Sequence, residues 1–523
     1  MIGSADGASL RTDVLVIGGG AAGAFAALAA RERGYEVTVV RRAWGATALS
    51  SGAADVAPDP QALPGLPLGG RQSILDAAAQ LALRRPDHPY AILRERLFLL
   101  PEALAFASAQ TSGVLAFGAP EEENRLLLSP LGLLKPAAGG LDSIAAGDLL
   151  RAGGTVGIVG FDRIPLIDAP LLARAAEEAV ALAGLDLRAV GIECDFFRHQ
   201  EDPLLRPHEL AERLERDPER LIESVRRALP QEAIALLLFP PLLSRVDAGE
   251  MIRGLQEGLG IRCAELPAGR QSLPGIRLQR ALEARLQQAG IRIVAGEVFV
   301  DPALGPAPVP EAVAGLVSPA GPALSTFVPP HVPAEGGGFT ALPPPRPPAD
   351  ALAAYVRAAM EGGLRLRGSE PSILPAARFD PSAGRFPPPA AQGQPIEAQA
   401  VILATGKFIG GGVRREGLLR EPIFDLPIWV RGRIDGGRWL GDWTAHELRD
   451  EQHAMRAGVR IDEGLRPLLP DEGTASDRLF ACGGVLAGND PAQDGAGIGL
   501  AVFTGYLAGV AAADRIAGGG GRG

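Results

Sequence analysis

The stretch "DVLVIGGGAAGAFAALAARERGYEVTVVR", residues 13–41, decides the fold of this chain. It begins with a short β-branched run at residues 13–17 that predicts a buried strand. The alanine-rich residues 20–33 predict a helix that Gly34 ends, and residues 35–40 predict a second strand. This order of strand, glycine turn, helix and strand opens the doubly wound sheets that bind dinucleotides.

The turn itself, Gly18-Gly-Gly20-Ala-Ala22-Gly23, has the G-x-G-x-x-G spacing of a dinucleotide site. Gly18 permits the tight turn, Gly20 lets a pyrophosphate approach the backbone, and Gly23 lets the helix pack closely on the strand. The helix N-terminus supplies free N–H groups and a positive partial charge. We therefore predict that the turn, Ala22 included, binds the phosphates of a nucleotide. A glycine turn that only packs tightly is the alternative.

The second strand ends in Arg41 and Arg42, where such folds usually place an acid that holds the ribose. One interpretation is that Arg41 holds a 2′-phosphate, as in NADP sites. A second is that the ribose contact is lost or supplied elsewhere and the nucleotide is a flavin. A third is that the two arginines simply face solvent. The loop that follows favours the flavin, because its small hydroxylated residues can donate hydrogen bonds to a flavin and its pyrophosphate; its candidates are Thr47, Ser50, Ser51 and Gly52.

Two further motifs lie near the other end of the chain. A strand predicted at residues 400–403 runs into Thr405 and Gly406, which bring small side chains and bare backbone close to a nucleotide. A strand predicted at 479–482 feeds a glycine-rich loop and then a helix from about residue 497, whose N-terminus favours negative charge on a reduced flavin ring. A tight strand-to-loop turn and glycine-rich helix packing are the respective alternatives. The candidates in the second motif are Gly483, Gly484, Asp490, Gly495, Gly497 and Gly499.

Strands typical of a nucleotide fold therefore stand at both ends of the chain, and the middle is predicted to be an insertion. We expect a flavin-binding domain built from residues 1–165 and 391–523, with an inserted domain at 166–390. Residues 301–350 contain 14 prolines and predict a long loop. Residues 71–115, 168–183, 208–229 and 278–290 are predicted to be helical, with an interruption near Pro218, and a strand is predicted at 291–294.

Composition excludes several classes of protein. The net charge of −10 disfavours bulk nucleic-acid binding. The three cysteines, Cys194, Cys263 and Cys482, lie far apart and cannot alone ligate an all-cysteine iron–sulfur cluster, and no metal site is predicted. The first dozen residues lack the features of a signal peptide. We expect a cytoplasmic protein, with a peripheral position on the inner face of the cell membrane as the alternative.

The motifs, in this order, resemble the two-dinucleotide-binding-domain flavoproteins, and within them the fumarate reductase/succinate dehydrogenase flavoprotein superfamily. Within that superfamily the chain is most similar to the B subunits of the anaerobic glycerol-3-phosphate dehydrogenases. The resemblance covers nearly the whole chain except the proline-rich stretch. It is carried by "VIGGGAAG" at residue 16, "TALSSGAADV" at 47, "LPGIRLQRALEARLQQAGIRIVAGEV" at 273, "VILATGKFIGGG" at 401, "REPIFDLPIW" at 420 and "LFACGGVLAGNDPAQDGAGIG" at 479.

This resemblance implies an α/β fold: a Rossmann-like flavoprotein with an inserted middle, or cap, domain. It also implies an electron-transfer flavin subunit of a glycerol-3-phosphate dehydrogenase (quinone) complex. In that family a sister flavoprotein subunit oxidises glycerol 3-phosphate, and an iron–sulfur subunit passes electrons toward quinone. FAD is the expected cofactor because the glycine motifs suit a pyrophosphate, and FMN, with one phosphate, is the alternative. Relatives that attach flavin covalently carry a histidine in the 43–52 loop; this chain has none, so we expect noncovalent binding.

Two rival functions stay open. One is a fumarate- or succinate-type dehydrogenase, which needs cationic and imidazole groups around a small acid. His446 and His453, or Arg414 and Arg415, are candidates for that role, although such histidines are more often surface or satisfied core residues and a solvated pair is the more common explanation of the arginines. The other rival is a scaffold subunit that keeps a flavin fold without turnover. No catalytic residue is assigned from the sequence.

Overall fold

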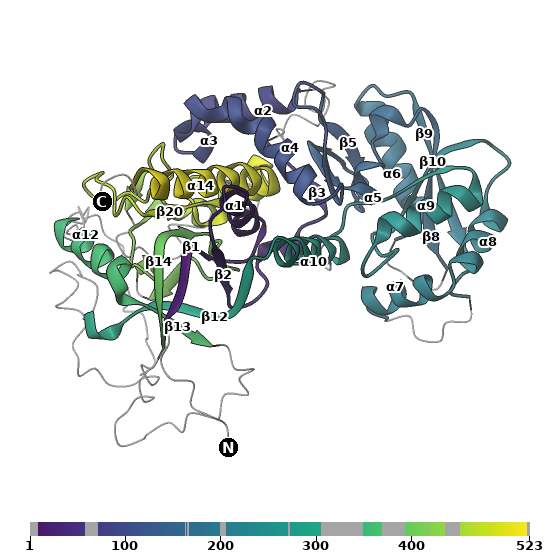
Figure 1. The fold of residues 1–523 in the computed structure, drawn as a ribbon. Helices are drawn as coiled ribbons and strands as arrows, with labels where there is room; N and C mark the ends of the chain where they lie inside the picture. Colours follow the sequence, from purple (N-terminus) through teal and green to yellow (C-terminus); the bar gives the residue numbers. More distant parts are fainter. Residues whose placement is uncertain are drawn as a thin grey trace, which may run out of the picture.

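The computed structural model describes residues 9–57, 72–162, 164, 167–198, 205–269, 272–304, 349–368, 393–416, 418–434 and 450–519. These residues form two lobes, each built on its own sheet, which meet near α5 (Asp142–Ala145) and α10 (Leu273–Gln288) (Figure 1). The prolines at 305–348 and His446 lie outside the described residues, and so does most of the predicted loop 301–350. At the end of that stretch, residues 349 and 350 begin α12 (Ala349–Ala358).

The first lobe contains a six-stranded sheet. Parallel pairing joins β12 (Arg292–Val300), β2 (Val37–Arg41), β1 (Leu10–Ile17), β14 (Gln394–Leu403) and β20 (Leu479–Ala481), in that order across the sheet. The sixth strand, β13 (Leu364–Gly368), runs antiparallel to both β12 and β14 and closes a circuit of strands. The sheet thus combines strands from both ends of the chain.

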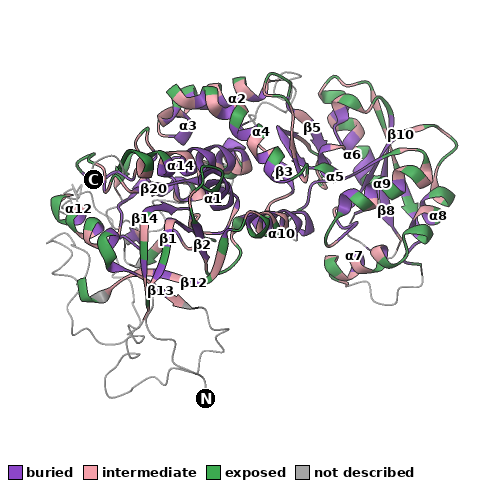
Figure 2. Ribbon diagram, in the orientation of Figure 1, coloured by how far each residue is buried: buried purple, intermediate pink, exposed green. Residues whose placement is uncertain are grey.

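Two helices cover this sheet and pack on each other: α1 (Ala21–Glu32) and α14 (Gly497–Gly519). Their backbones touch, because a Cβ on Gly505 would lie 2.4 Å from the carbonyl oxygen of Ala22, and one on Gly509 would lie 2.2 Å from that of Ala26. By length and composition α14 could cross a membrane, but 72% of its most apolar stretch is buried inside the protein. Figure 2 shows both helices mostly in the colour of buried residues. Here α14 is a helix of the core.

The second lobe contains a parallel four-stranded sheet in the order β11 (Arg262–Glu265), β10 (Ile234–Phe239), β8 (Gly154–Phe161) and β9 (Leu187–Cys194). The helix α6 (Ala169–Leu182) begins where the Asp168 carboxylate accepts a hydrogen bond from the N–H of Leu171, at 2.9 Å. Three more helices accompany this sheet: α7 (Pro207–Arg216), α8 (Pro218–Ala228) and α9 (Ala248–Leu259). After β11 the chain returns through α10 to β12 in the first sheet.

Smaller elements complete the first lobe. Its helices are α2 (Ile74–Arg84), α3 (Pro89–Ile92), α4 (Leu100–Gln110) and α13 (Pro491–Asp494), and its short strands are β3 (Ala53–Ala54), β4 (Leu115–Phe117), β7 (Gly139–Leu141), β15 (Arg414–Glu416), β16 (Leu418–Arg420), β17 (Ile428–Val430), β18 (Arg433–Ile434) and β19 (Gly458–Val459). The pair β5 (Arg125–Leu128) and β6 (Leu134–Ala137) lies between the lobes, with Leu127 in the core of the first lobe and Leu128 in that of the second.

The structure confirms the strands and helix of the opening stretch, the strands near 291, 400 and 479, the helix at 168–183 and the helix break at Pro218. The stretch predicted to be helical at 71–115 is helical over most of its length but is divided: α2 ends before Pro86, α3 and α4 follow separately, and β4 begins at Leu115. The strand pairings also do not follow the domain boundaries expected near residues 165 and 390. Residues 154–161 belong to the four-stranded sheet, and β12 and β13 belong to the six-stranded one. The division of the chain into domains stays a prediction.

Candidate flavin site

The glycine turn joins β1 to α1 in a conformation that other residues would not tolerate. Gly18 has a φ of +120°, and a Cβ there would lie 2.1 Å from the carbonyl oxygen of Ala404 in the segment after β14. A Cβ on Gly23 would lie 1.9 Å from the carbonyl oxygen of Gly18. Gly18 and Gly23 are therefore required for packing whether or not a nucleotide binds.

Gly20 differs from these two glycines. It is the N-terminal cap of α1, and the nearest atom to a Cβ built there is the hydroxyl oxygen of Thr47, at 3.1 Å. That hydroxyl accepts a hydrogen bond from the N–H of Ala21, at 2.9 Å. Thr47 therefore lies at the first turn of α1, where the free N–H groups favour a phosphate. The sequence prediction placed these two segments in one site, and the structure brings them together.

The rest of the hydroxylated loop is fixed to the lobe interface. The carbonyl oxygen of Ser51 accepts a hydrogen bond from the N–H of Ala268 at 2.8 Å, and that of Gly52 accepts one from Leu141, also at 2.8 Å. The carbonyl oxygen of Ser50 accepts a hydrogen bond from the hydroxyl of Ser272, which caps α10. The loop thus lies between α1 and the start of α10.

The C-terminal motifs reach the same region. Gly483, with a φ of +73°, lies against Ala22, since a Cβ on Gly483 would be 2.4 Å from that of Ala22. Gly484 lies close to Gly406, at 3.5 Å between a built Cβ and Cα. A further hydrogen bond joins α14 to the segment just after the hydroxylated loop: the N–H of Gly499 donates to the carbonyl oxygen of Asp55 at 2.8 Å. The structure therefore gathers all four sequence motifs around the N-terminus of α1.

Three candidates in the last motif already have structural roles. The carboxylate of Asp490 caps α13 by accepting hydrogen bonds from Ala492 and Gln493. Gly495 ends α13 in a left-handed conformation, with a φ of +59°, and Gly497 begins α14. These roles shape the loop before α14 without excluding contact with a cofactor.

The two arginines after β2 form ion pairs with carboxylates. Arg41 lies 3.1 Å from Glu283 of α10, and Arg42 lies 3.5 Å from Glu297 of β12. Arg414 shares Glu297 at 3.1 Å, while Arg415 is exposed. The guanidinium groups of Arg41 and Arg42 therefore do not stand as isolated cations, which weakens the interpretation of a 2′-phosphate site.

The sequence did not predict a buried charged cluster beside the C-terminal loop. Arg456 donates to both carboxylate oxygens of Asp494, at 2.8 and 2.9 Å. His88 is fully buried with Nε2 3.9 Å from Asp494, and burial lowers its pKa to about 4. The ammonium of Lys407 donates to the carbonyl oxygens of Met455 and Asn489, and burial lowers its pKa to about 7. The only sequence signal was polar residues inside otherwise apolar segments.

His453, a candidate for contact with a substrate, lies next to this cluster. It is half-buried, desolvation lowers its pKa, and its Nδ1 atom is buried without a hydrogen bond among the described residues. Its predicted companion His446 lies outside the described residues, so the pair stays a prediction.

The residues present fit a flavin nucleotide. Two buried polar atoms on the gathered segments, Ser50 Oγ and Thr405 Oγ1, have no hydrogen-bond partner in the described part of the chain. A buried polar atom without a partner costs about 1–3 kcal/mol. A polar ligand carrying hydroxyls and phosphates would supply those partners. The free N–H groups of α1 provide donors for its phosphates.

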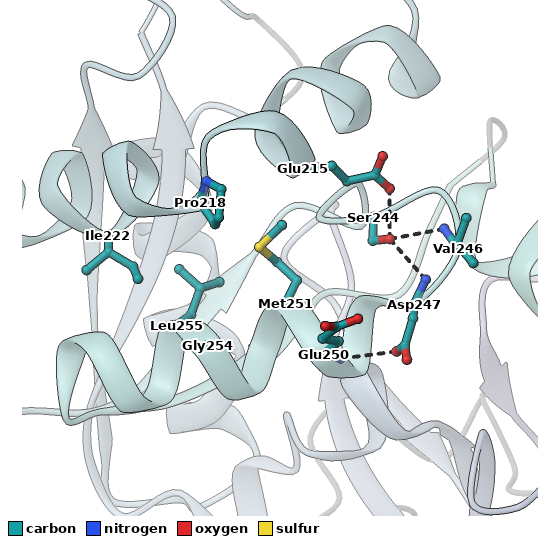
Figure 3. A pocket seen from close by; sticks show the side chains of 10 residues that line it. All are labelled: Glu215, Pro218, Ile222, Ser244, Val246, Asp247, Glu250, Met251, Gly254 and Leu255. Atoms are coloured by element: carbon teal, nitrogen blue, oxygen red, sulfur yellow. Dashed lines mark hydrogen bonds between the residues drawn. The ribbon is translucent and has the colours of Figure 1, made fainter.

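A separate pocket of about 480 Å³ lies in the second lobe, between α7, α8 and α9 (Figure 3). The hydroxyl of Ser244 donates to Glu215 at 2.8 Å and accepts from the N–H groups of Val246 and Asp247, while Met251 and Leu255 give an apolar wall. None of the residues that line it belongs to the four flavin motifs.

Several curated relatives match nearly the whole chain. The B subunit of a probable anaerobic glycerol-3-phosphate dehydrogenase of Halobacterium salinarum is 27% identical over 519 residues, 97% of this chain and 99% of that protein. The B subunit of the anaerobic glycerol-3-phosphate dehydrogenase of Actinobacillus pleuropneumoniae serotype 5b is 24% identical over 502 residues, 94% of this chain and 96% of that protein. Among solved structures, a 3-ketosteroid-delta4-(5alpha)-dehydrogenase from Rhodococcus jostii RHA1 aligns over 98% of both chains with 11% identity and a TM-score of 0.35.

The family described as "FAD binding domain" matches residues 13–228 and 389–500. These ranges contain the glycine turn, the hydroxylated loop, Thr405–Gly406 and the loop that precedes α14, which are the segments that the structure brings together. Because the match covers more than half of the sequence, this chain belongs to the FAD binding domain family and is an FAD-dependent oxidoreductase.

Proposed function

We propose that this chain is the electron-transfer flavin subunit of a glycerol-3-phosphate dehydrogenase complex, relaying electrons from glycerol 3-phosphate oxidation toward iron–sulfur clusters and quinone. The proposal rests mainly on the similarity, over 94–97% of this chain, to proteins named as the B subunit of that dehydrogenase. The proposed partners are a sister flavoprotein subunit and an iron–sulfur subunit. The proposed location is the cytoplasm or the inner face of the cell membrane.

The positions of the cysteines support the need for a partner. Cys194 and Cys263 lie in β9 and β11, Cys482 follows β20, and burial raises the pKa of each thiol. An all-cysteine iron–sulfur cluster takes four thiolates. The three cysteines of this chain are core residues, so a cluster that received its electrons would belong to another subunit.

The proposed FAD contacts follow from the gathered segments. The N–H groups at the start of α1 and the hydroxyl of Thr47 would hold the pyrophosphate, and the bare backbone at Gly406 and Gly484 would lie along the rest of the cofactor. When bound, FAD accepts two electrons together and releases them singly, which suits a relay between a two-electron oxidation and one-electron carriers. Lys407 and Arg456 would set the charge beside the loop that precedes α14, next to the neutral imidazole of His88.

Reconstitution of the complex tests this proposal. The chain loaded with FAD is assayed with glycerol 3-phosphate and an artificial acceptor, first alone and then with the sister flavoprotein and iron–sulfur subunits. We expect little turnover by the chain alone and quinone reduction when all three subunits are present. A matched reconstitution with Gly20→Val, which should fold but lack flavin, should be inactive.

Two results would contradict the proposal. Rapid turnover of fumarate or succinate by the chain alone would identify it as a dicarboxylate dehydrogenase. Full quinone reduction with the flavin-free Gly20→Val chain would show that the chain acts as a scaffold rather than as an electron carrier.

A further inference from the structure

Glu283, in α10, carries an unusual set of hydrogen bonds. Its Oε1 atom accepts from Trp44 Nε1 at 2.7 Å and from Gln279 Nε2 at 3.0 Å, and it pairs with Arg41 Nη2 at 3.1 Å. Two hydrogen bonds and one ion pair on the same oxygen fix the orientation of the carboxylate. All three of these contacts reach Oε1, and Oε2 takes part in none of them.

This carboxylate is tied to the glycine turn through two neighbours. Gln279, which is fully buried, donates to the carbonyl oxygen of Gly19 at 2.8 Å as well as to Glu283. The side chain of Arg41 lies across the turn, because a Cβ on Gly19 would be 2.7 Å from Arg41 Cδ. Glu283 therefore stands beside both the turn and the end of β2. That is where an acid of β2 itself normally holds the nucleotide ribose.

We propose that Glu283 supplies the carboxylate that binds the ribose hydroxyls in the adenosine half of FAD. In this chain the acid would come from α10, the helix that follows the second lobe. It lies about 240 residues after the end of β2, where this fold normally carries the acid. Oε1 holds the side chain in place, and Oε2 accepts the hydrogen bond from a hydroxyl. The side chain is 18% exposed, so the carboxylate is only partly hydrated.

The same arrangement selects against a 2′-phosphate. Arg41 is the residue that would bind such a phosphate, but it pairs with Glu283. A phosphate near this carboxylate would meet a like charge, whereas a hydroxyl would meet an acceptor. Glu283 thus favours an unphosphorylated ribose, and this inference requires only FAD binding, not the proposed relay to quinone.

Equilibrium binding measures the contact directly. The flavin-free chain is titrated with FAD and with the FAD analogue whose adenosine ribose lacks both hydroxyls, and binding is followed by flavin fluorescence. Because hydrogen bonds to charged groups are strong, we expect the wild-type chain to bind FAD about 10- to 100-fold more tightly than the analogue. The variant Glu283→Gln should bind FAD more weakly and should lose most of this discrimination.

Glu297→Gln is the matched control, because Glu297 is also an acid paired with arginines near the end of β2. It should keep the discrimination of the wild-type chain. Two results would overturn the proposal: equal affinity of the wild-type chain for FAD and the analogue, or undiminished discrimination in Glu283→Gln. The first needs no variant, so the test does not depend on how well the variant folds. Either result would leave the reconstitution experiment unaffected.

Discussion

The hydroxyl of Thr47 accepts a hydrogen bond from the N–H of Ala21 at 2.9 Å, joining the loop after β2 to the first turn of α1. This N–H is one of the donors that a helix leaves unpaired at its start. The contact therefore stabilises the helix terminus and places a hydroxyl beside the N–H groups proposed to hold the pyrophosphate.

Replacing Thr47 with Val should remove this contact while keeping the side-chain shape. We expect the affinity for FAD to fall about tenfold and the free energy of unfolding to fall by about 1 kcal/mol, the usual effect of a lost helix cap. Thr47→Ser, which keeps the hydroxyl, is the control and should stay close to the wild type. Fluorescence titration and urea unfolding measure the two effects. Equal behaviour of the Val and Ser variants would show that the hydroxyl is unimportant.

Gly509 tests the close packing of α14 on α1. A Cβ there would lie 2.2 Å from the carbonyl oxygen of Ala26, so Gly509→Ala should force the helices apart and lower the free energy of unfolding by about 2 kcal/mol. Gly254 in α9 is the matched control, since a Cβ there would meet no atom of the described residues within 4 Å. Gly254→Ala should raise stability by roughly 0.5–1 kcal/mol. Similar effects of the two substitutions would refute the packing argument.

Local signals explain which parts of this fold were predictable. The turn from β1 to α1 depends on glycines at fixed spacing, so Gly18 and Gly23 identify it in the sequence. The pairing of Thr38 with Arg292, which returns the chain to the first sheet, joins residues that are distant in sequence and carry no local signal. The sequence analysis missed Glu283 for the same reason. Gln279, four residues earlier, is a buried polar residue on the same face of α10, but only tertiary packing shows that both residues lie beside the glycine turn.

The ion pair between Glu265 and Arg277 joins the lobes at a fully buried position. Glu265 accepts from Arg277 Nη2 at 2.5 Å, Ser143 Oγ at 2.8 Å and the N–H of Leu243 at 3.0 Å. Glu265→Gln would leave Arg277 without its counter-charge, so we expect a loss of about 3–5 kcal/mol in the free energy of unfolding.

Glu36→Gln provides the comparison, because Glu36 forms an exposed pair with Arg292 at 3.7 Å. It should cost less than about 1 kcal/mol. Urea unfolding of both variants measures the difference. A loss below about 1 kcal/mol in Glu265→Gln would mean that the buried pair does not hold the lobes together.

His88 should give the protein an acid-sensitive stability. Burial is the main cause that lowers its pKa from 6.5 to about 4, and the positive charges of Arg456 and Lys407 also lower it. The negative charge of Asp494 acts in the other direction and raises the pKa. The unfolded chain therefore binds a proton below pH 6.5 that the folded chain refuses until about pH 4. The contribution of neutral His88 to the free energy of unfolding is therefore complete above pH 6.5 and is lost as the pH falls toward 4. The loss between pH 7 and pH 5 should be about 2 kcal/mol.

His88→Asn should reduce this pH dependence while keeping a side chain that can cap α3. The exposed His208 supplies the control, because His208→Asn should follow the wild-type profile. Urea unfolding at pH 7 and pH 5 compares the three proteins. An unchanged loss of stability in His88→Asn would assign the acid sensitivity to another group.

Titration of the Gly20→Val chain with FAD tests the central claim that the turn at 18–23 binds the pyrophosphate. Gly20 is suited to this test because, among the described residues, only the Thr47 hydroxyl lies near its Cβ position, at 3.1 Å, so the variant should fold. The wild-type chain should bind FAD at one per chain and FMN at least tenfold more weakly, with the flavin released into solution by acid. Gly20→Val, with a thermal midpoint close to that of the wild type, should bind no measurable FAD. Normal FAD binding by a folded Gly20→Val chain would contradict the account.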